Sequence, residues 1–263
     1  MKPKYNFQFI PKSRIATFDV FSIGLSKHHV SALIEFDVTV GREKLKELKA
    51  NGIRISFNAW IIKVISKTLE QHREASAYLY NKKKLIIFED INISIIVEKE
   101  IGDKKVPIPL VIKKTNEKSV SEITQEIEKS KNEILSDKDI VLNRKPKPYE
   151  RLYYILPGYI RRSFWEFMLR HPRMAYKNMG NVAITSLVMA GHINGWFIHK
   201  SVHPISFGIG SIIKKPVVIE NEIKIREILN MTILFDHDVI DGAPFAKFLK
   251  DLSKSIEYGD ELT

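Results

Sequence analysis

The sequence contains 263 residues, carries a formal net charge of +11 and has no cysteine. The lack of cysteine excludes disulfides, thiolate metal sites and a cysteine nucleophile. No segment has the roughly 18 consecutive apolar residues that cross a membrane, and the first residues lack the apolar centre of a signal peptide. We therefore expect a soluble, cytoplasmic protein.

The positive charge is dispersed along the chain. Short lysine runs at 82–84, 104–105 and 113–114 lie between apolar segments and are typical of solvated turns. Nucleic-acid binding usually depends on a basic patch or stripe on one face. The distribution predicts no nucleic-acid partner, whereas a basic surface suits a phosphate-rich ligand.

The N-terminal part begins with residues 1–13, which are polar and interrupted by proline, and which predict an arm ahead of a single domain at 14–263. Apolar and polar residues alternate from Arg14 to Phe21. Residues 30–38 predict a strand, after which Thr39 is a candidate cap for a short helix. Ser56 is the predicted cap of a helix over residues 57–71.

The middle of the chain shows a hairpin pattern at 78–88 and a strand pattern at 91–97. Residues 106–112 predict an edge or irregular strand, because their prolines cannot donate to a ladder. Ser119 and Glu122 have the spacing of a capping box and open a predicted helix.

Residues 138–178 are basic and aromatic, with apolar positions at roughly helical spacing. We predict one or two helices packed on the body. A subunit contact, a substrate lid and a membrane-surface helix are further interpretations that the sequence leaves open.

The last third predicts strands at 180–187, 205–213 and 228–235, with a hairpin turn near Asn221. A sharp turn from Asp236 to Gly242 follows, and then an amphipathic helix. A histidine at the end of a rigid strand, His237, is a candidate proton acceptor because its pKa lies near neutrality. Asp241 has a simpler interpretation as the N-cap of the helix.

Three further histidines, His192, His199 and His203, lie close together in the sequence. His199 and His203 have the i, i+4 spacing of a metal pair, but the segment lacks the helix and the glutamate of a zinc protease motif. We predict no metal site.

Several of these segments together resemble one family. The HxxxDG motif from His237 to Gly242, residues 36–39 (FDVT), the segment VPIPLVIKKTNEKSVSEITQEIEK from Val106, and the strand at 180–187 are similar to those of the dihydrolipoyl acyltransferases of 2-oxoacid dehydrogenase complexes and of chloramphenicol acetyltransferase. The resemblance covers about residues 14–137 and 179–258. It implies an α/β, two-layer fold of the chloramphenicol acetyltransferase type, with a mixed β-sheet and packed helices, as a stand-alone catalytic domain without a lipoyl or subunit-binding domain.

The resemblance also implies roles for single residues. His237 matches the general base, Asp241 the aspartate that orients the site, and Thr185 the hydroxyl that donates to the oxyanion, with Ser186 beside it. Gly242 completes the motif, and Arg14 is a candidate arginine partner for Asp241. Asp238 departs from the basic residue that usually follows the histidine, and a carboxylate close to His237 would raise its pKa.

The implied activity is transfer of an acyl group between a coenzyme A thioester and a thiol or hydroxyl acceptor. Coenzyme A is then a substrate, and a lipoyl group would come from another protein. The family assembles as trimers or multiples of trimers with active sites between subunits, so we expect a homotrimer. The alternative is a non-catalytic trimeric scaffold on the same fold.

Overall fold

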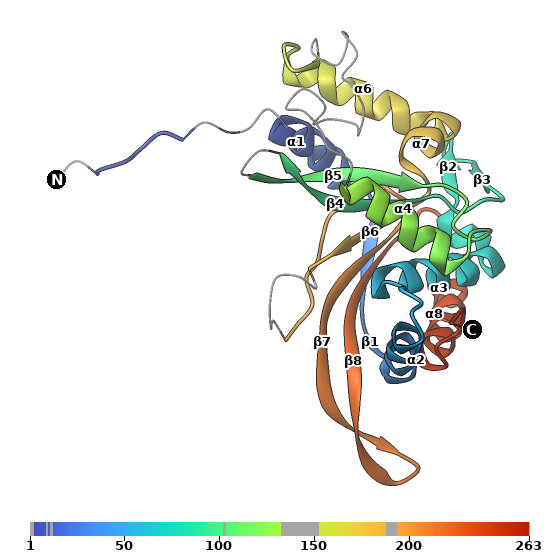
Figure 1. The fold of residues 1–263 in the computed structure, drawn as a ribbon. Coiled ribbons are helices and arrows are strands. Elements are labelled where there is room, and N and C mark those ends of the chain that lie inside the picture. Colours follow the sequence, from blue (N-terminus) through green and yellow to red (C-terminus); the bar gives the residue numbers. More distant parts are fainter. Residues whose placement is uncertain are drawn as a thin grey trace.

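The computed structural model describes residues 3–8, 10, 13–101, 104–132, 153–187 and 194–262. Its centre is a six-stranded sheet with the strand order β1-β8-β7-β6-β4-β5, beside a small two-stranded sheet of β2 and β3 (Figure 1). Within the described residues, no helix is long and apolar enough to cross a membrane.

The strands are β1 (His29–Asp37), β2 (Tyr78–Tyr80), β3 (Lys84–Ile86), β4 (Ile93–Ile101), β5 (Lys104–Ile112), β6 (Val182–Ser186), β7 (Ile205–Ile219) and β8 (Glu222–Asp236). The helices are α1 (Ser13–Gly24), α2 (Thr39–Ala50), α3 (Phe57–Gln71), α4 (Val120–Asn132), α6 (Gly158–Arg170), α7 (Pro172–Met179) and α8 (Gly242–Glu257), with a short 3-10 turn η1 (Arg73–Ser76).

The sheet is mixed. β6 pairs in parallel with both β4 and β7, whereas β1 with β8, β7 with β8 and β4 with β5 are antiparallel. The predicted strand with prolines, β5, lies at the edge of the sheet, where a missing N–H is tolerated.

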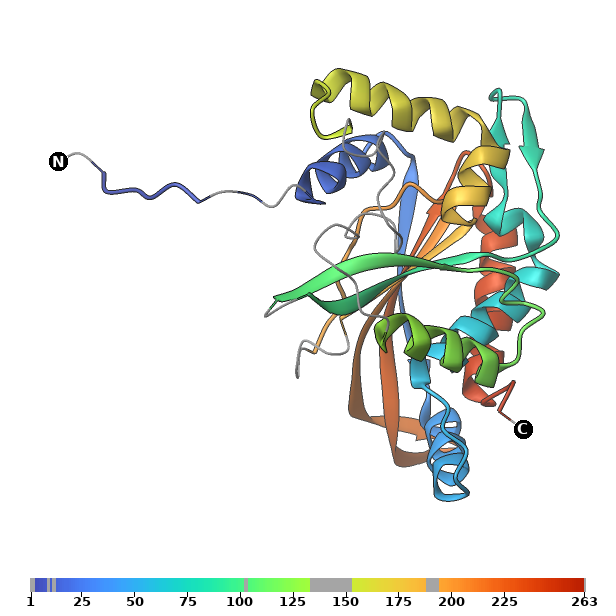
Figure 2. The same ribbon diagram turned by 45° about the horizontal axis from the view of Figure 1, so that its top comes forward.

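Helices α2, α3, α4 and α8 cover one face of the sheet, and α1, α6 and α7 gather at one end of the molecule (Figures 1 and 2). The main core lies between the sheet and the first of these groups. It includes Trp60 of α3, Phe207 of β7 and Phe248 of α8, none of which is exposed. The predicted two-layer α/β fold is thereby confirmed.

Two predicted helix starts are confirmed by their hydrogen bonds. The Ala59 N–H donates to Ser56 Oγ over 3.1 Å at the start of α3. In the capping box before α4, the Ser119 N–H donates to Glu122 Oε2 over 2.8 Å, and the Glu122 N–H donates to Ser119 Oγ over 3.2 Å.

Three details differ from the sequence patterns. Residues Arg14–Phe21 form helix α1 despite their alternation, because the helix buries Asp19 and Ile23 against α6 and α7. Thr39 is not the N-cap of α2. It is the first helical residue, and its N–H and Oγ1 donate to Asp37 Oδ1 over 2.9 and 2.6 Å. β7 and β8 each extend to fifteen residues around the turn at Asn221, because their pairing continues beyond the body of the protein (Figure 1).

Helices α6 and α7 belong to the basic aromatic segment, whose residues 138–152 lie outside the described part. The two helices pack on the body as predicted for helices there. Arg161 of α6 forms an ion pair of 2.7 Å with the buried Asp19 of α1, and Trp165 Nε1 donates to the Tyr153 hydroxyl over 3.0 Å. Met168 is buried. The helix is therefore fixed to α1 on one side.

Gly180 lies in the connection between α7 and β6, and its replacement tests how tightly this connection packs against Asn92. Its φ is +75°, and a Cβ atom there would lie 2.3 Å from the Asn92 carbonyl oxygen. We expect Gly180→Ala to lower the free energy of unfolding by about 3 kcal/mol or more, because it adds a backbone clash to the cost of a left-handed alanine.

The matched control is Gly52→Ala, where φ is +82° and no atom lies within 4 Å of the added Cβ. It should cost only about 1–2 kcal/mol. Chemical denaturation of both variants measures the difference, and equal losses would show that the contact with Asn92 does not constrain the fold.

Candidate functional site

The loop between β8 and α8 holds His237 at the end of a central strand. The His237 N–H donates to the His28 carbonyl over 3.0 Å, and the Val239 and Ile240 N–H groups both donate to the Asp236 carbonyl. The His237 side chain is exposed, with its ring centre 6.2 Å from that of Phe235. The backbone is thus fixed while the imidazole stays accessible.

A buried ion pair stabilises this loop. Lys27, in the connection between α1 and β1, places Nζ 2.7 Å from Asp236 Oδ2, and the Asp236 side chain is only 2% exposed. The other carboxylate oxygen accepts from the Asp238 N–H over 3.3 Å. The sequence analysis missed this pair, because Lys27 and Asp236 are more than two hundred residues apart and no local pattern joins them.

Asp238 is engaged by another histidine. Both of its carboxylate oxygens lie 3.0 Å from His28 Nδ1. The structure thus gives Asp238 a hydrogen-bond partner in His28, which the sequence pattern did not indicate.

Asp241 and Arg14 are not brought together. Asp241 occupies the N-cap position of α8, but its side chain makes no capping hydrogen bond. Arg14 lies exposed on α1. In the described part of the chain neither side chain takes part in an ion pair. Gly242 is the first residue of α8, and a Cβ atom there would meet nothing within 4 Å.

Thr185 and Ser186 turn to opposite faces of β6, as the two-residue period of a strand requires. Ser186 follows the side of the buried Ile184, which faces the helices. Thr185 lies on the other face, half-buried, in a row with Gly208 of β7 and Thr232 of β8. Of the two hydroxyls, only that of Thr185 lies on the polar face of the sheet.

One chain does not bring His237 and Thr185 together. His237 lies five positions after Thr232, just beyond the end of β8, which is about 16 Å, and two strand spacings of about 4.8 Å separate Thr232 from Thr185. Their Cα atoms are thus roughly 20 Å apart, beyond the reach of two side chains on one reacting atom.

The other histidines have separate partners. His203 is buried, with Nε2 3.0 Å from the Met179 carbonyl oxygen and Nδ1 3.2 Å from Ser201 Oγ. His199 Nε2 lies 2.8 Å from Ser206 Oγ. Burial lowers the pKa of each imidazole to about 4. The two histidines thus have different hydrogen-bond partners, and His192 lies outside the described residues.

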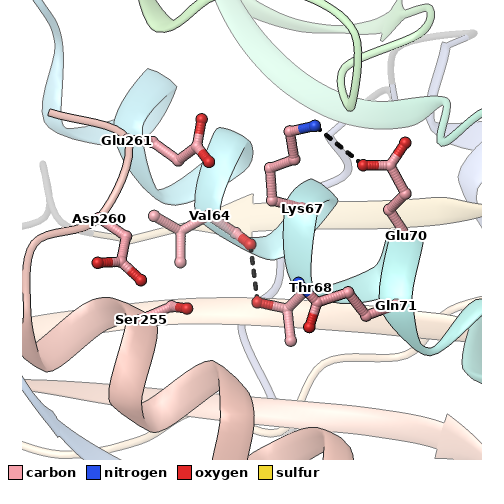
Figure 3. A pocket seen from close by; sticks show the side chains of 8 residues that line it. All are labelled: Val64, Lys67, Thr68, Glu70, Gln71, Ser255, Asp260 and Glu261. Atoms are coloured by element: carbon pink, nitrogen blue, oxygen red, sulfur yellow. Dashed lines mark hydrogen bonds and ion pairs between the residues drawn. The ribbon is translucent and has the colours of Figure 1, made fainter. Parts of the chain in front are cut away.

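A polar hollow of about 310 Å³ lies elsewhere, between α3 and the end of α8 (Figure 3). Its lining includes the ion pair Lys67–Glu70, and Asp260 and Glu261 of the C-terminal segment. α8 is sixteen residues long, or about 24 Å, and His237 precedes its other end. The hollow is therefore separate from the His237 loop.

The sequence matches the family model of the 2-oxoacid dehydrogenases acyltransferase catalytic domain over residues 24–138 and 178–263. These two ranges make up well over half of the chain. The chain belongs to this family. The unmatched part between them corresponds closely to the basic aromatic segment that the sequence analysis set apart.

Two proteins of similar sequence are named as acyltransferase components of dehydrogenase complexes. The acetyltransferase component of the pyruvate dehydrogenase complex of Mycoplasma genitalium is 26% identical over 82% of this chain and 47% of its own length. The lipoamide acyltransferase component of the branched-chain complex of Bacillus subtilis is 24% identical over 89% of this chain and 48% of its own length. The chain therefore spans about half the length of the curated relatives it matches.

Solved structures show the same fold. A probable dihydrolipoamide acetyltransferase from Listeria monocytogenes superposes with a TM-score of 0.67 at 21% identity, covering 96% of this chain and 94% of that one. A chloramphenicol acetyltransferase superposes with a TM-score of 0.50 at 12% identity, over the full length of both chains. The resemblance found in the sequence is thereby confirmed.

The buried pair under the His237 loop can be tested by removing its cation. We expect Lys27→Met to lower the free energy of unfolding by about 3–5 kcal/mol, because Asp236 then stays buried without a counter-charge. The control is His28→Ala, which breaks the exposed contact with Asp238 and should cost at most about 1 kcal/mol. Similar losses in urea denaturation would contradict the importance of burial at Asp236.

The buried histidines predict how stability depends on pH. The pKa of His203 falls from its ordinary 6.5 to about 4 in the folded chain. Below pH 6.5 His203 therefore binds a proton in the unfolded chain but stays neutral in the folded chain. The free energy of unfolding then falls as the pH drops towards 4. The loss from this group is at most about 3.4 kcal/mol, because each pKa unit corresponds to about 1.36 kcal/mol.

Denaturation curves measured between pH 7.5 and 4.5 test this sign. His203→Gln should be less stable at neutral pH but show a shallower decline with acid. A variant with the same decline as the wild type would show that His203 does not cause it.

Proposed function

We propose that this chain is a coenzyme A-dependent acyltransferase in which His237 is the general base and Thr185 donates to the oxyanion. The observation that carries the proposal is the position of His237 in a member of an acyltransferase family. Its backbone is fixed through His28 and Asp236, while its imidazole is exposed and free to meet a substrate.

The proposed reaction has two proton transfers. His237 takes the proton of the acceptor thiol or hydroxyl, and the resulting anion attacks the carbonyl carbon of the acyl thioester. The tetrahedral oxyanion accepts a hydrogen bond from the Thr185 hydroxyl. When it collapses, the bond to the coenzyme A sulfur breaks, and the leaving thiolate takes the proton back from His237.

The two residues contribute by different effects. Proton transfer by a positioned base accelerates such steps by roughly 10²–10⁴-fold. One oxyanion donor contributes roughly 10²–10³-fold. Asp241, which has no partner in the described part of the chain, would orient the loop once a neighbouring group reaches it.

The separation within one chain supports a site shared between subunits. His237 and Thr185 are roughly 20 Å apart in one protomer by the strand register. They act on the same carbonyl only if they come from different copies, so we propose a homotrimer, or a multiple of trimers, in which each site uses His237 of one copy and Thr185 of another.

The acceptor is a further part of the proposal. The relatives named above are lipoamide or dihydrolipoyllysine acyltransferases and are about twice as long as this chain. We propose a dihydrolipoyl thiol as the acceptor.

The test measures, by chromatography, the free coenzyme A and S-acyl-dihydrolipoamide formed from acyl-coenzyme A thioesters and free dihydrolipoamide, because transfer between thiols leaves the total thiol unchanged. We expect His237→Ala to lower kcat by at least about 10²-fold and Thr185→Val by about 10²-fold, with the fold unchanged by circular dichroism. When the two inactive variants are unfolded, mixed and refolded together, activity should return, because hybrid trimers contain some intact sites.

Two results would contradict the proposal. Wild-type protein that binds no coenzyme A and turns over no thioester would favour the non-catalytic scaffold. If the mixture of the two inactive variants forms hybrid trimers but regains no activity, the shared site is contradicted.

A further inference from the structure

The polar face of the central strands contains buried groups without hydrogen-bond partners. Leu229, Met231 and Ile233 of β8 face the helices, so Asn230 and Thr232, which alternate with them, face the other side. Asn230 is fully buried and Thr232 is 1% exposed. Within the described chain, neither Asn230 Oδ1 nor Thr232 Oγ1 has a hydrogen-bond partner.

His199 brings a third such atom to the same place. The segment before β7 passes over this face, and the imidazole occupies the space left open by Gly208, where an added Cβ would lie 2.8 Å from His199 Nδ1. Ser206, two residues away on the same face of β7, holds Nε2 at 2.8 Å. Nδ1 itself is buried and has no partner in the part of the chain that is described.

These atoms lie beside the proposed oxyanion donor. Gly208 is paired with Thr185 on one side and with Thr232 on the other. Neighbouring strands are about 4.8 Å apart, so His199 Nδ1 lies between the two threonines, roughly one strand spacing from each. Thr185, at the β6 end of the row, is only half-buried.

Unpaired polar groups in such a place indicate a missing partner. Burying such a group without a hydrogen bond destabilises the folded state, because the group loses its hydrogen bonds to water and gains none in return. An alkyl group between His199 and Thr232 would leave both atoms unpaired. A carboxylate would meet no charged group in this row, since burial lowers the pKa of His199 to about 4 and keeps it neutral at neutral pH.

We propose that His199 and Thr232 form a polar subsite for the acyl group and select acyl thioesters that carry a hydroxyl close to the carbonyl. A hydroxyl both donates and accepts, so it can pair with Nδ1 in either tautomer of His199 and with the Thr232 hydroxyl at the same time. A 3-hydroxyacyl group places its oxygen a few bonds from the carbonyl, which corresponds roughly to the one strand spacing between the subsite and Thr185. This inference rests on the proposed acyltransferase function and specifies its substrate class.

The experiment compares 3-hydroxybutyryl-coenzyme A with butyryl-coenzyme A, two substrates that differ by one oxygen, using the full chain and dihydrolipoamide. We expect wild-type kcat/KM to favour the hydroxyacyl substrate by about 10-fold or more, equivalent to one good hydrogen bond of about 1.4 kcal/mol. Thr232→Val, which keeps the shape and removes the hydroxyl, should reduce this ratio towards one.

Two variants of His199 distinguish the loss of the Nδ1 atom from a change in side-chain size. His199→Gln keeps a group at the position of Nε2, facing Ser206, and loses Nδ1, so the ratio should fall as in Thr232→Val. His199→Asn keeps a group near the position of Nδ1 and should retain part of the preference. The control is Thr68→Val on α3, a buried threonine whose hydroxyl donates to the Val64 carbonyl over 2.9 Å, and which should keep the wild-type ratio.

The possible results are distinct. A wild type that uses both substrates equally, or variants with an unchanged ratio, would overturn the subsite, leave the acyltransferase function standing and indicate that the three atoms bind only ordered water. A wild type that turns over neither these nor any other acyl thioester would overturn the proposed function and the subsite with it.

Discussion

The two-residue period of the central strands β7 and β8 determines which side chains face the helices and which face the other side of the sheet. Phe207, Ile209, Met231 and Ile233 turn towards the helices and build the core, so the residues between them must turn the other way. A shift of the pairing by one residue would exchange the two sets and place the polar groups in the core. The hydrophobic effect that fixes the register therefore also fixes where Thr185 and Thr232 lie.

The His237 loop depends on a second constraint, the burial of Asp236. A carboxylate with almost no contact with water needs a cation, and Lys27 provides it from the segment between α1 and β1. That segment also supplies the His28 carbonyl for the His237 N–H and the imidazole for Asp238. The histidine is thus positioned by residues near the start of the chain, although its motif lies near the end.

Local signals predicted much of the fold. Ser56, Ser119 and Glu122 cap the helices that they were expected to begin, because capping depends on residues within one turn. The prediction failed where distant packing outweighs local pattern. The alternation after Arg14 gave no sign of α1, whose helical form depends on contacts of Asp19 and Ile23 with the segment after residue 152. The subsite around His199 was equally invisible, since its members come from separate strands and an irregular segment.

The sequence by itself determined the family, the two-layer α/β fold, the HxxxDG loop and the turning of Thr185 and Ser186 to opposite faces of their strand, because motif spacing and strand period are local properties. Only the tertiary structure decided which partners the charged residues take. It paired Asp238 with His28 and Asp236 with Lys27, left Asp241 apart from Arg14, and placed His199 over Gly208. It also separated His237 from Thr185 within one chain. Such outcomes follow from strand order and burial, which bring together residues that no sequence distance relates.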